Sequence, residues 1–224
     1  MKAIFDNVSN ICSEITTKAY STSFSLGIRI LDKSLHNPIY GIYGFVRFAD
    51  EIVDSFHDYN KKELFNKYKA DTYLGINNKI SLNPIINSFQ EVVNKYSIDH
   101  TLIESFLNSM EMDLEDQNYD EKTYKKYILG SAEVVGLMCL TIFVNGDKNK
   151  YTKLKPYAMK LGSAFQKINF LRDVNDDYQT LGRTYFPEVN IDNFSKSEKL
   201  KIENEIENEF IEGLRGIKML PNTS

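Results

Sequence analysis

Apolar residues recur at three- and four-residue spacing along most of the chain. Val8, Ile11, Ile15 and Ala19 form the first such series, and this spacing places side chains on one face of an α-helix. The same pattern continues near residues 61–73, 84–96, 99–115, 120–145, 151–178 and 196–214. No segment alternates convincingly at period two, the pattern typical of a half-buried strand. The sequence therefore predicts an all-α protein.

A long helix is predicted to begin at Pro38, because proline is favoured at the first helical position. The apolar residues that follow at helical spacing are Ile39, Ile42, Tyr43, Val46, Ala49 and Val53. The gaps between the predicted helices carry ordinary turn residues, and none resembles a flexible interdomain linker. We therefore expect a single domain over residues 1–224.

A polar stripe interrupts the apolar surface of this long helix. At about 100° per residue, Tyr43, Arg47, Asp50 and Asp54 fall on one face. Carboxylates one turn apart repel each other by roughly 0.2–0.5 kcal/mol in an isolated helix. Because apolar residues flank the stripe on both sides, the pattern is typical of a polar strip that lines a largely apolar cavity.

A second stripe of the same kind lies in the predicted helix near 151–178. Gln166, Asn169, Asp173 and Asp177 share one helix face there, with an arginine at position 172 beside them. Hard divalent cations such as Mg²⁺ take oxygen ligands and are usually held by one or two carboxylates together with substrate phosphates. The two stripes, facing each other, would supply such an open site, and arginines at 47 and 172 would donate to phosphate oxygens.

Simpler interpretations of these residues stay open. A single pair of aspartates four residues apart is common, and interhelical salt bridges would also explain it. Two pairs on apolar helices favour a metal, because burying a charge without a partner is costly. The hydroxyls of Ser21, Ser23 and Ser25 likewise fit either helix capping or hydrogen bonding to phosphate.

Composition and charge narrow the classes of partner. The chain has 224 residues, 42% of them hydrophobic, and a net charge of −4 that offers no general basic surface for nucleic acid. Cys12 and Cys139 show no metal spacing and suit a reducing compartment. No secretory signal is recognisable, and the apolar run 128–144 is shorter than the roughly 20 residues that span a bilayer. We therefore expect a cytoplasmic protein in which this run is a buried core helix.

Several segments together resemble the squalene and phytoene synthases, the family that joins prenyl diphosphates head to head. They are YSTSFSLG, IYGFVRFADEIVD, YILGSAEVVGLMCL and LGSAFQKINFLRDVNDDYQTLGRTYFP, in the order and approximate spacing of the family. The resemblance implies an all-α isoprenoid synthase helical bundle around a central cavity. It also implies Mg²⁺, or Mn²⁺ in its place, bridging the aspartate motifs to a substrate diphosphate.

The resemblance further implies roles for individual residues. The metal ligands would be Asp50, Asp54, Asn169, Asp173 and Asp177. The contacts to diphosphate and substrate would be Ser21, Thr22, Ser23, Tyr43, Arg47, Gln166, Arg172 and Arg183. The residues implied in catalysis itself are Tyr43, Arg47, Asp50, Asp54, Asp173 and Asp177. Arg183 resembles a position that helps to close the mouth of the site, and Tyr185 is a weaker candidate.

The implied reaction condenses two prenyl diphosphates through a cyclopropylcarbinyl diphosphate. We favour the conversion of geranylgeranyl diphosphate to phytoene in carotenoid biosynthesis, because SAEVVGLMCLTIFV looks closer to bacterial carotenoid-pathway members. Squalene or dehydrosqualene synthesis from farnesyl diphosphate is the alternative, and NADPH is implied for the squalene branch alone. The lipid-soluble product suggests transient, peripheral contact with a membrane.

Two departures from the family pattern keep other functions open. Leu129 stands where many relatives carry a tyrosine, and the chain stops at Ser224, whereas the family continues, so C-terminal helices are expected to be missing. A catalytically inactive relative with a binding or assembly role is therefore a second hypothesis. A head-to-tail prenyltransferase or terpene cyclase is a third, although these usually carry Asp-Asp-x-x-Asp where this chain has Asp50-Glu51-x-x-Asp54.

Overall fold

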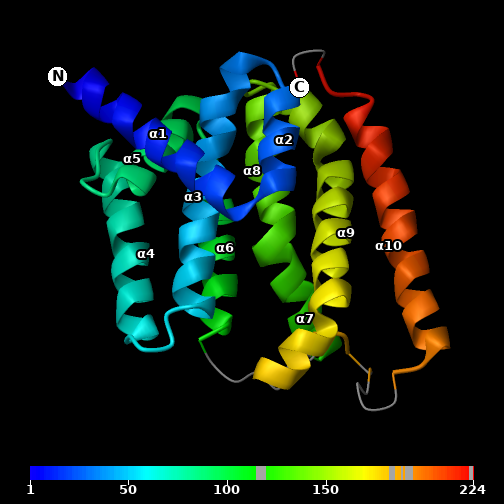
Figure 1. Cartoon of the computed structure of the whole chain (residues 1–224). Coiled ribbons are helices and arrows are strands. Elements are labelled where there is room, and N and C mark those ends of the chain that lie inside the picture. The colour runs from blue at the N-terminus through cyan, green and yellow to red at the C-terminus, as the bar shows by residue number, and fades with distance from the viewer. Residues whose placement is uncertain (115–119, 182–184, 188, 190–193, 222–223) are drawn as a thin grey trace. The chain divides into compact units, whose positions relative to one another are not determined.

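The computed structural model describes residues 1–114, 120–181, 185–187, 189, 194–221 and 224, with only the backbone of 175–181. Within these residues the chain forms helices joined by short turns and no β-strand (Figure 1). This result confirms the all-α prediction.

The chain groups into two compact units. The first comprises Met1–Thr101, Met138–Tyr151 and Leu220–Ser224, and the second comprises Leu102–Leu137 and Thr152–Met219. The expectation of a single domain stays a prediction. Each unit is described separately below.

The first unit is built around α3 and α5. Its helices are α1 (Lys2–Tyr20), α2 (Thr22–Ile30), α3 (Lys33–Asp54), α4 (Lys61–Asn78) and α5 (Pro84–Tyr96). Phe45 of α3 is fully buried and stacks on Phe89 of α5, with ring centroids 3.8 Å apart. The Tyr68 hydroxyl of α4 donates to the Phe45 carbonyl oxygen at 3.0 Å. Aromatic packing thus holds α3 between α4 and α5.

The long helix α3 does not begin at Pro38, so that prediction is wrong. Asp32 caps the helix, because its side chain accepts a hydrogen bond from the Ser34 amide at 2.9 Å. Pro38 lies inside the helix, where its missing N–H leaves the carbonyl four residues earlier without that donor. The added first turn is held by the buried side chain of Leu35, which is 7% exposed.

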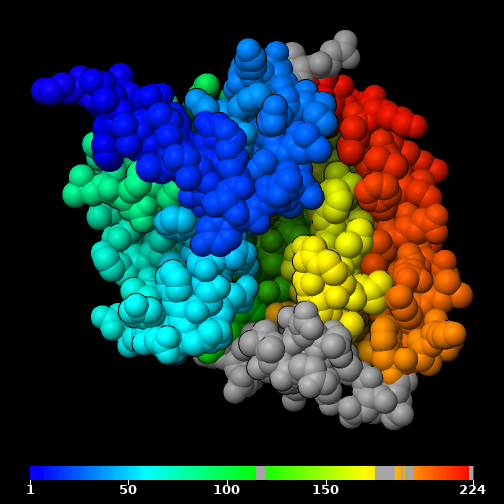
Figure 2. Space-filling model, in the orientation of Figure 1, coloured from blue at the N-terminus to red at the C-terminus, as the bar shows by residue number. Residues whose placement is uncertain are grey.

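Helix α1 packs with its hydroxyl face inward. Ser9, Ser13 and Thr17 are 0% exposed, whereas the apolar series Ile4, Val8, Ile11 and Ile15 is 43–70% exposed. A Cβ on Gly44 of α3 would lie 3.0 Å from the Ser13 hydroxyl, so only small residues fit between α1 and α3. Figure 2 shows the outer side of α1, in dark blue, uncovered.

The second unit contains most of α6 and α9 and all of α7 and α10. The bounds of the elements in this half of the chain are α6 (His100–Met112), α7 (Glu121–Ile128), η1 (Leu129–Glu133), α8 (Val134–Phe143), α9 (Lys148–Leu181) and α10 (Lys196–Ile217). η1 is a π-helical turn, and a Cβ on its Gly130 would lie 1.9 Å from the Ser109 hydroxyl of α6. Glycine is therefore required where these two elements cross.

One helical stretch is long and apolar enough to cross a membrane, by length and composition only. It is Glu121–Phe143, and 44% of its most apolar part is buried. Core helices of soluble proteins pass the same test, so this finding is weak evidence for a membrane span. Leu137, Met138 and Ile142 are at most 2% exposed, which supports the predicted buried helix.

Candidate functional site

Arg47 is the centre of the polar stripe on α3. Its guanidinium donates to the carboxylates of Asp50 and Glu51, three and four residues further along the helix. The guanidinium carbon also lies 4.4 Å from the centroid of the Tyr20 ring on α1, within cation–π range. Its buried Nε has no hydrogen-bond partner among the described residues, so one donor of this side chain is unused.

Asp50 and Asp54 form a strained carboxyl pair at the C-terminal end of α3. Burial, followed by the charge of Asp54, raises the pKa of Asp50 to about 7, and the two carboxyls share a hydrogen bond. Asp54 is the last residue of α3, where the negative end of the helix dipole also disfavours a carboxylate. The Lys61 ammonium donates to the backbone carbonyl oxygens of Val53 and Asp54 at 2.8 and 3.4 Å. It therefore offsets part of the negative charge at this helix end without binding the carboxylates through these two contacts.

The serine-rich segment joins α2 to this stripe. Ser21 is the N-cap of α2, since its hydroxyl accepts from the Phe24 amide at 3.1 Å, and the capping interpretation is therefore confirmed for Ser21. The Ser21 side chain also shares a hydrogen bond with the Tyr43 hydroxyl, and burial raises the pKa of Tyr43. Thr22 and Ser23 are exposed in the first turn of α2.

The second predicted stripe lies on α9, as expected from its spacing. Asn169 is exposed, and Gln166 and Asp173 are partly buried. Arg172 binds the Asp173 carboxylate in a bidentate manner, with Nε–Oδ1 and Nη2–Oδ2 distances of 2.7 and 2.6 Å. The Asp177 side chain lies outside the described residues.

The closing residues predicted after α9 are described only in part. Arg183 lies outside the described residues. Tyr185 is described, and its ring stacks on the ring of Phe170 of α9, with centroids 4.1 Å apart. The centroid of the Tyr185 ring also lies 5.5 Å from that of Tyr127. Tyr185 therefore belongs to an aromatic cluster of the second unit.

The donor chemistry of the α3 stripe fits a divalent cation. No three His, Cys, Asp or Glu side chains among the described residues gather closely enough to hold a metal ion. An open Mg²⁺ site needs only one or two carboxylates together with substrate phosphates, and burial and the charge of Asp54 raise the pKa of Asp50 even beside Arg47. Because the α3 and α9 stripes belong to different units, their facing each other stays a prediction.

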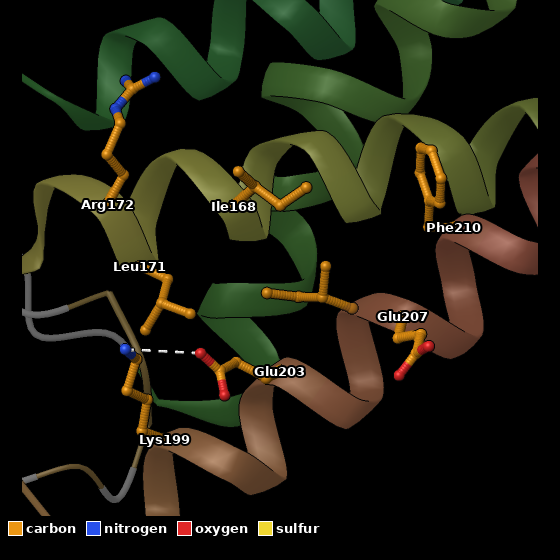
Figure 3. Close-up of a pocket in the computed structure, with 8 residues that line it drawn as sticks. Ile168, Leu171, Arg172, Lys199, Glu203, Glu207 and Phe210 are labelled. Atoms are coloured by element: carbon orange, nitrogen blue, oxygen red, sulfur yellow. Dashed lines mark ion pairs between the residues drawn. The ribbon is translucent and has the colours of Figure 1, made fainter. Parts of the chain in front are cut away.

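A groove of about 510 Å³ between α9 and α10 was not predicted. The residues that line it are Ile168, Leu171, Arg172, Lys199, Glu203, Ile206, Glu207 and Phe210. Figure 3 shows Lys199 paired with Glu203, at 3.5 Å, while Arg172 points away from that pair. The groove thus has an apolar floor and charged edges.

Tyr20 and Leu129 lie outside the predicted set of site residues. Tyr20 contacts Arg47 from α1, and no pattern within α3 could assign that partner. Leu129 is 38% exposed and begins the π-helical turn η1, a local distortion frequent at functional sites.

Comparison with known proteins places the chain in a family. The squalene/phytoene synthase family matches residues 17–214. The 4,4'-diapophytoene synthase of Staphylococcus haemolyticus is 26% identical over 188 residues, covering 83% of this chain and 64% of that relative. Phytoene synthase 1, chloroplastic, of Solanum lycopersicum is 27% identical over 191 residues, covering 82% and 44%. The chain therefore spans less than two thirds of the length of either relative.

A solved structure shows the same fold. The crystal structure of a dehydrosqualene synthase in complex with ligand superimposes with a TM-score of 0.84 at 21% identity, covering 97% of this chain and 80% of that one. The predicted isoprenoid synthase fold is therefore confirmed. Since the family match extends over most of its length, the chain belongs to the squalene/phytoene synthase family.

Proposed function

We propose that this chain catalyses the head-to-head condensation of two prenyl diphosphates with Mg²⁺, or Mn²⁺, as cofactor. The observation that carries the proposal is the Asp50–Asp54 pair beside Arg47. Two carboxyls held together at the negative end of a helix raise each other's pKa, and a bound divalent cation would favour their charged forms more strongly than Arg47 alone does. Arg47 adds a positive charge beside this pair, and its buried Nε has no partner among the described residues.

The metal would be held by oxygen atoms of both stripes. The proposed ligands are Asp50, Asp54, Asn169, Asp173 and Asp177. When bound, Mg²⁺ would neutralise charge that grows on the departing diphosphate. Arg47 and Arg172 would donate to the same diphosphate, because guanidinium groups bind phosphate oxygens in a bidentate manner.

The first turn of α2 is proposed to contribute to diphosphate binding. Backbone N–H groups at a helix N-terminus attract anions, and Thr22 and Ser23 are exposed there. Ser21 is committed to capping and to Tyr43, so it would position these neighbours. Gln166 and Tyr43 would contact the substrate, and Arg183 would help to close the site.

The reaction would begin when the C–O bond of one allylic diphosphate breaks and its electron pair leaves with the diphosphate. The double bond of the second prenyl chain would attack the cation, and loss of a proton would give the cyclopropylcarbinyl diphosphate. A second ionisation, rearrangement and proton loss would give a linear hydrocarbon. Apolar walls are needed because water would quench the cations.

Geranylgeranyl diphosphate is the substrate we favour, with phytoene as product. Farnesyl diphosphate and a dehydrosqualene-type product form the second candidate, because the similar proteins include a 4,4'-diapophytoene synthase and a dehydrosqualene synthase. NADPH would be needed only for squalene.

Product analysis tests this proposal. The purified chain would be incubated with Mg²⁺ and labelled geranylgeranyl or farnesyl diphosphate, with and without NADPH, and its products identified by mass spectrometry. We expect a C40 hydrocarbon without NADPH, and none from Asp50→Asn. A C30 product would select the second candidate, whereas no product from either substrate would favour the inactive relative.

A cytoplasmic location with transient membrane contact is also proposed. The exposed series Ile4, Val8, Ile11 and Ile15 on α1 is the surface that would make such a contact. Flotation with phosphatidylcholine liposomes would test it, and a chain that stays at the bottom of the gradient would remove the membrane as a partner.

A further inference from the structure

The buried side of α10 follows the spacing of a coiled-coil seam. Its buried residues, separated by steps of four and three, are Ile202, Ile206, Glu209, Gly213 and Gly216. α10 runs beside α9 (Figure 1). A Cβ on Gly213 would lie 2.8 Å from Leu161 Cβ, and a Cβ on Gly216 would lie 2.4 Å from Tyr157 Cβ. The two glycines therefore allow a close approach of the helices at one particular alignment.

Glu209 is the charged residue in this seam, and three donors of α9 converge on it. Lys160 Nζ donates to Oε1 at 2.9 Å, while Ser163 Oγ and Lys167 Nζ both donate to Oε2 at 2.8 Å. The side chains of Lys167 and Glu209 are only 6% and 11% exposed. We call Lys160, Ser163, Lys167 and Glu209 the register cluster.

A buried ion pair adds little net stability, because desolvation offsets the attraction. A polar residue in a helix seam instead selects one alignment, since every other alignment leaves it without partners. Lys167 Nζ also binds Glu205 Oε1, which lies one turn before Glu209. Moving α10 by one turn, about 5.4 Å, would separate Glu209 from its donors and bring Glu205 toward them. It would also bring side chains to the positions that Gly213 and Gly216 now occupy. The close contacts at Gly213 and Gly216 exclude this shift, so the glycines and the register cluster together specify one alignment.

On α9, the cluster lies on the side of the helix that faces away from Asn169. Lys160, Ser163 and Lys167 share one face of α9, and at about 100° per residue Asn169 points some 200° away from Lys167. A different side of α9 packs against η1, because a Cβ on Gly162 would lie 2.9 Å from the Ala132 carbonyl oxygen of η1. Rotation of α9 about its own axis is therefore opposed both by η1 and by Glu209.

We propose that Glu209 is a positioning residue for the α9 stripe. By binding Lys160, Ser163 and Lys167 it fixes the rotation of α9, and so the direction in which Asn169 and Asp173 point. This inference rests on the proposed function, because it assigns those two residues to the metal and diphosphate. Glu209 itself touches neither.

Calorimetric titration with Mg²⁺ and inorganic diphosphate tests the inference. We expect Glu209→Gln to bind Mg²⁺ and diphosphate with the same stoichiometry as the parent but at least tenfold more weakly. The variant would be folded, but its Asn169 and Asp173 side chains would point in the wrong direction. Glu207→Gln, the same substitution at an exposed position of α10, is the matched control and should bind as the parent does. If Glu209→Gln has the same dissociation constant as the parent, whether or not its stoichiometry is lower, the positioning role is overturned.

Hydrogen exchange of α9 amides makes the test independent of ligand binding. We expect amides of residues 166–173 to exchange faster in Glu209→Gln than in Glu207→Gln. If the parent fails to bind Mg²⁺ and diphosphate, the proposed function fails, and unchanged exchange would refute the positioning role separately. If Glu209→Gln does not fold, Ser163→Ala replaces it in both experiments, because it removes only one hydrogen bond to Glu209. This variant is expected to bind Mg²⁺ and diphosphate about threefold more weakly than the parent.

Discussion

Arg47 shows how a single side chain organises its surroundings. It contacts two carboxylates of its own helix and a tyrosine of α1. The contacts within α3 follow from i, i+3 and i+4 spacing and could be predicted from the sequence. The Tyr20 contact joins separate helices, so helical periodicity does not contain it.

Glu209 gives a prediction about pH at the same scale. Burial alone would raise the pKa of this carboxyl, but hydrogen bonds from Lys160, Lys167 and Ser163 hold it below its ordinary value. A lowered pKa means that the charged form stabilises the fold above pH about 4.5. This stabilisation is lost as pH falls through the folded-state pKa.

The measurement is the free energy of unfolding of the parent and of Glu209→Gln between pH 7 and pH 3. The stability advantage of the parent should be largest near neutral pH and shrink as the pH is lowered below 4.5, because glutamine cannot titrate. Glu207→Gln, at an exposed position, should differ little from the parent at any pH. A parent advantage that grows toward low pH would contradict the assigned hydrogen bonds.

Helix α1 shows what periodicity can and cannot give at the scale of an element. The series Val8, Ile11, Ile15 and Ala19 correctly indicates a helix, because residues at this spacing share a face. It does not say which face is buried. The hydroxyl face is the buried one, since Gly44 lets Ser13 approach closely and Asn87 of α5 donates to Ser9 at 3.1 Å. Partners on other helices decided the orientation.

The contact between η1 and α6 predicts a large effect from one methyl group. Gly130→Ala would place its Cβ 1.9 Å from Ser109 Oγ and 2.6 Å from the Ser105 carbonyl oxygen. Backbone atoms cannot give way cheaply, so we expect a loss of about 2 kcal/mol or more in unfolding free energy. Urea denaturation would measure it.

Gly27→Ala is the matched control on α2. No atom lies within 4 Å of its added Cβ, and alanine in a helix is favoured over glycine by about 0.5–1 kcal/mol. This variant should be as stable as the parent or slightly more stable. Equal losses in both variants would show that the close contact at Gly130 is not the cause.

At the scale of the whole molecule, the local parts of the candidate site were predictable and the distant ones were not. Both aspartate stripes lie on single helices, α3 and α9, so spacing alone identified them. Lys167 and Glu209 are 42 residues apart in the chain, and neither spacing nor composition links them. The family resemblance supplied the fold, which the match over residues 17–214 bears out.

The proposed function requires that the α3 and α9 stripes, which lie in different compact units, hold one metal and diphosphate together. A double-mutant cycle measures this directly, because residues that act on one ligand give non-additive effects. The variants are Asp50→Asn, Asp173→Asn and the double substitution. Asp71→Asn, in an exposed pair with Lys67, is the surface control.

The measurement is the dissociation constant of inorganic diphosphate in saturating Mg²⁺, by calorimetry. Each single variant should bind at least about tenfold more weakly, and the double variant should lose less than the product of the single losses, with a coupling of about 1 kcal/mol or more. Asp71→Asn should bind as the parent does. Losses that multiply independently, or single variants that bind as tightly as the parent, would contradict a site shared by the two stripes.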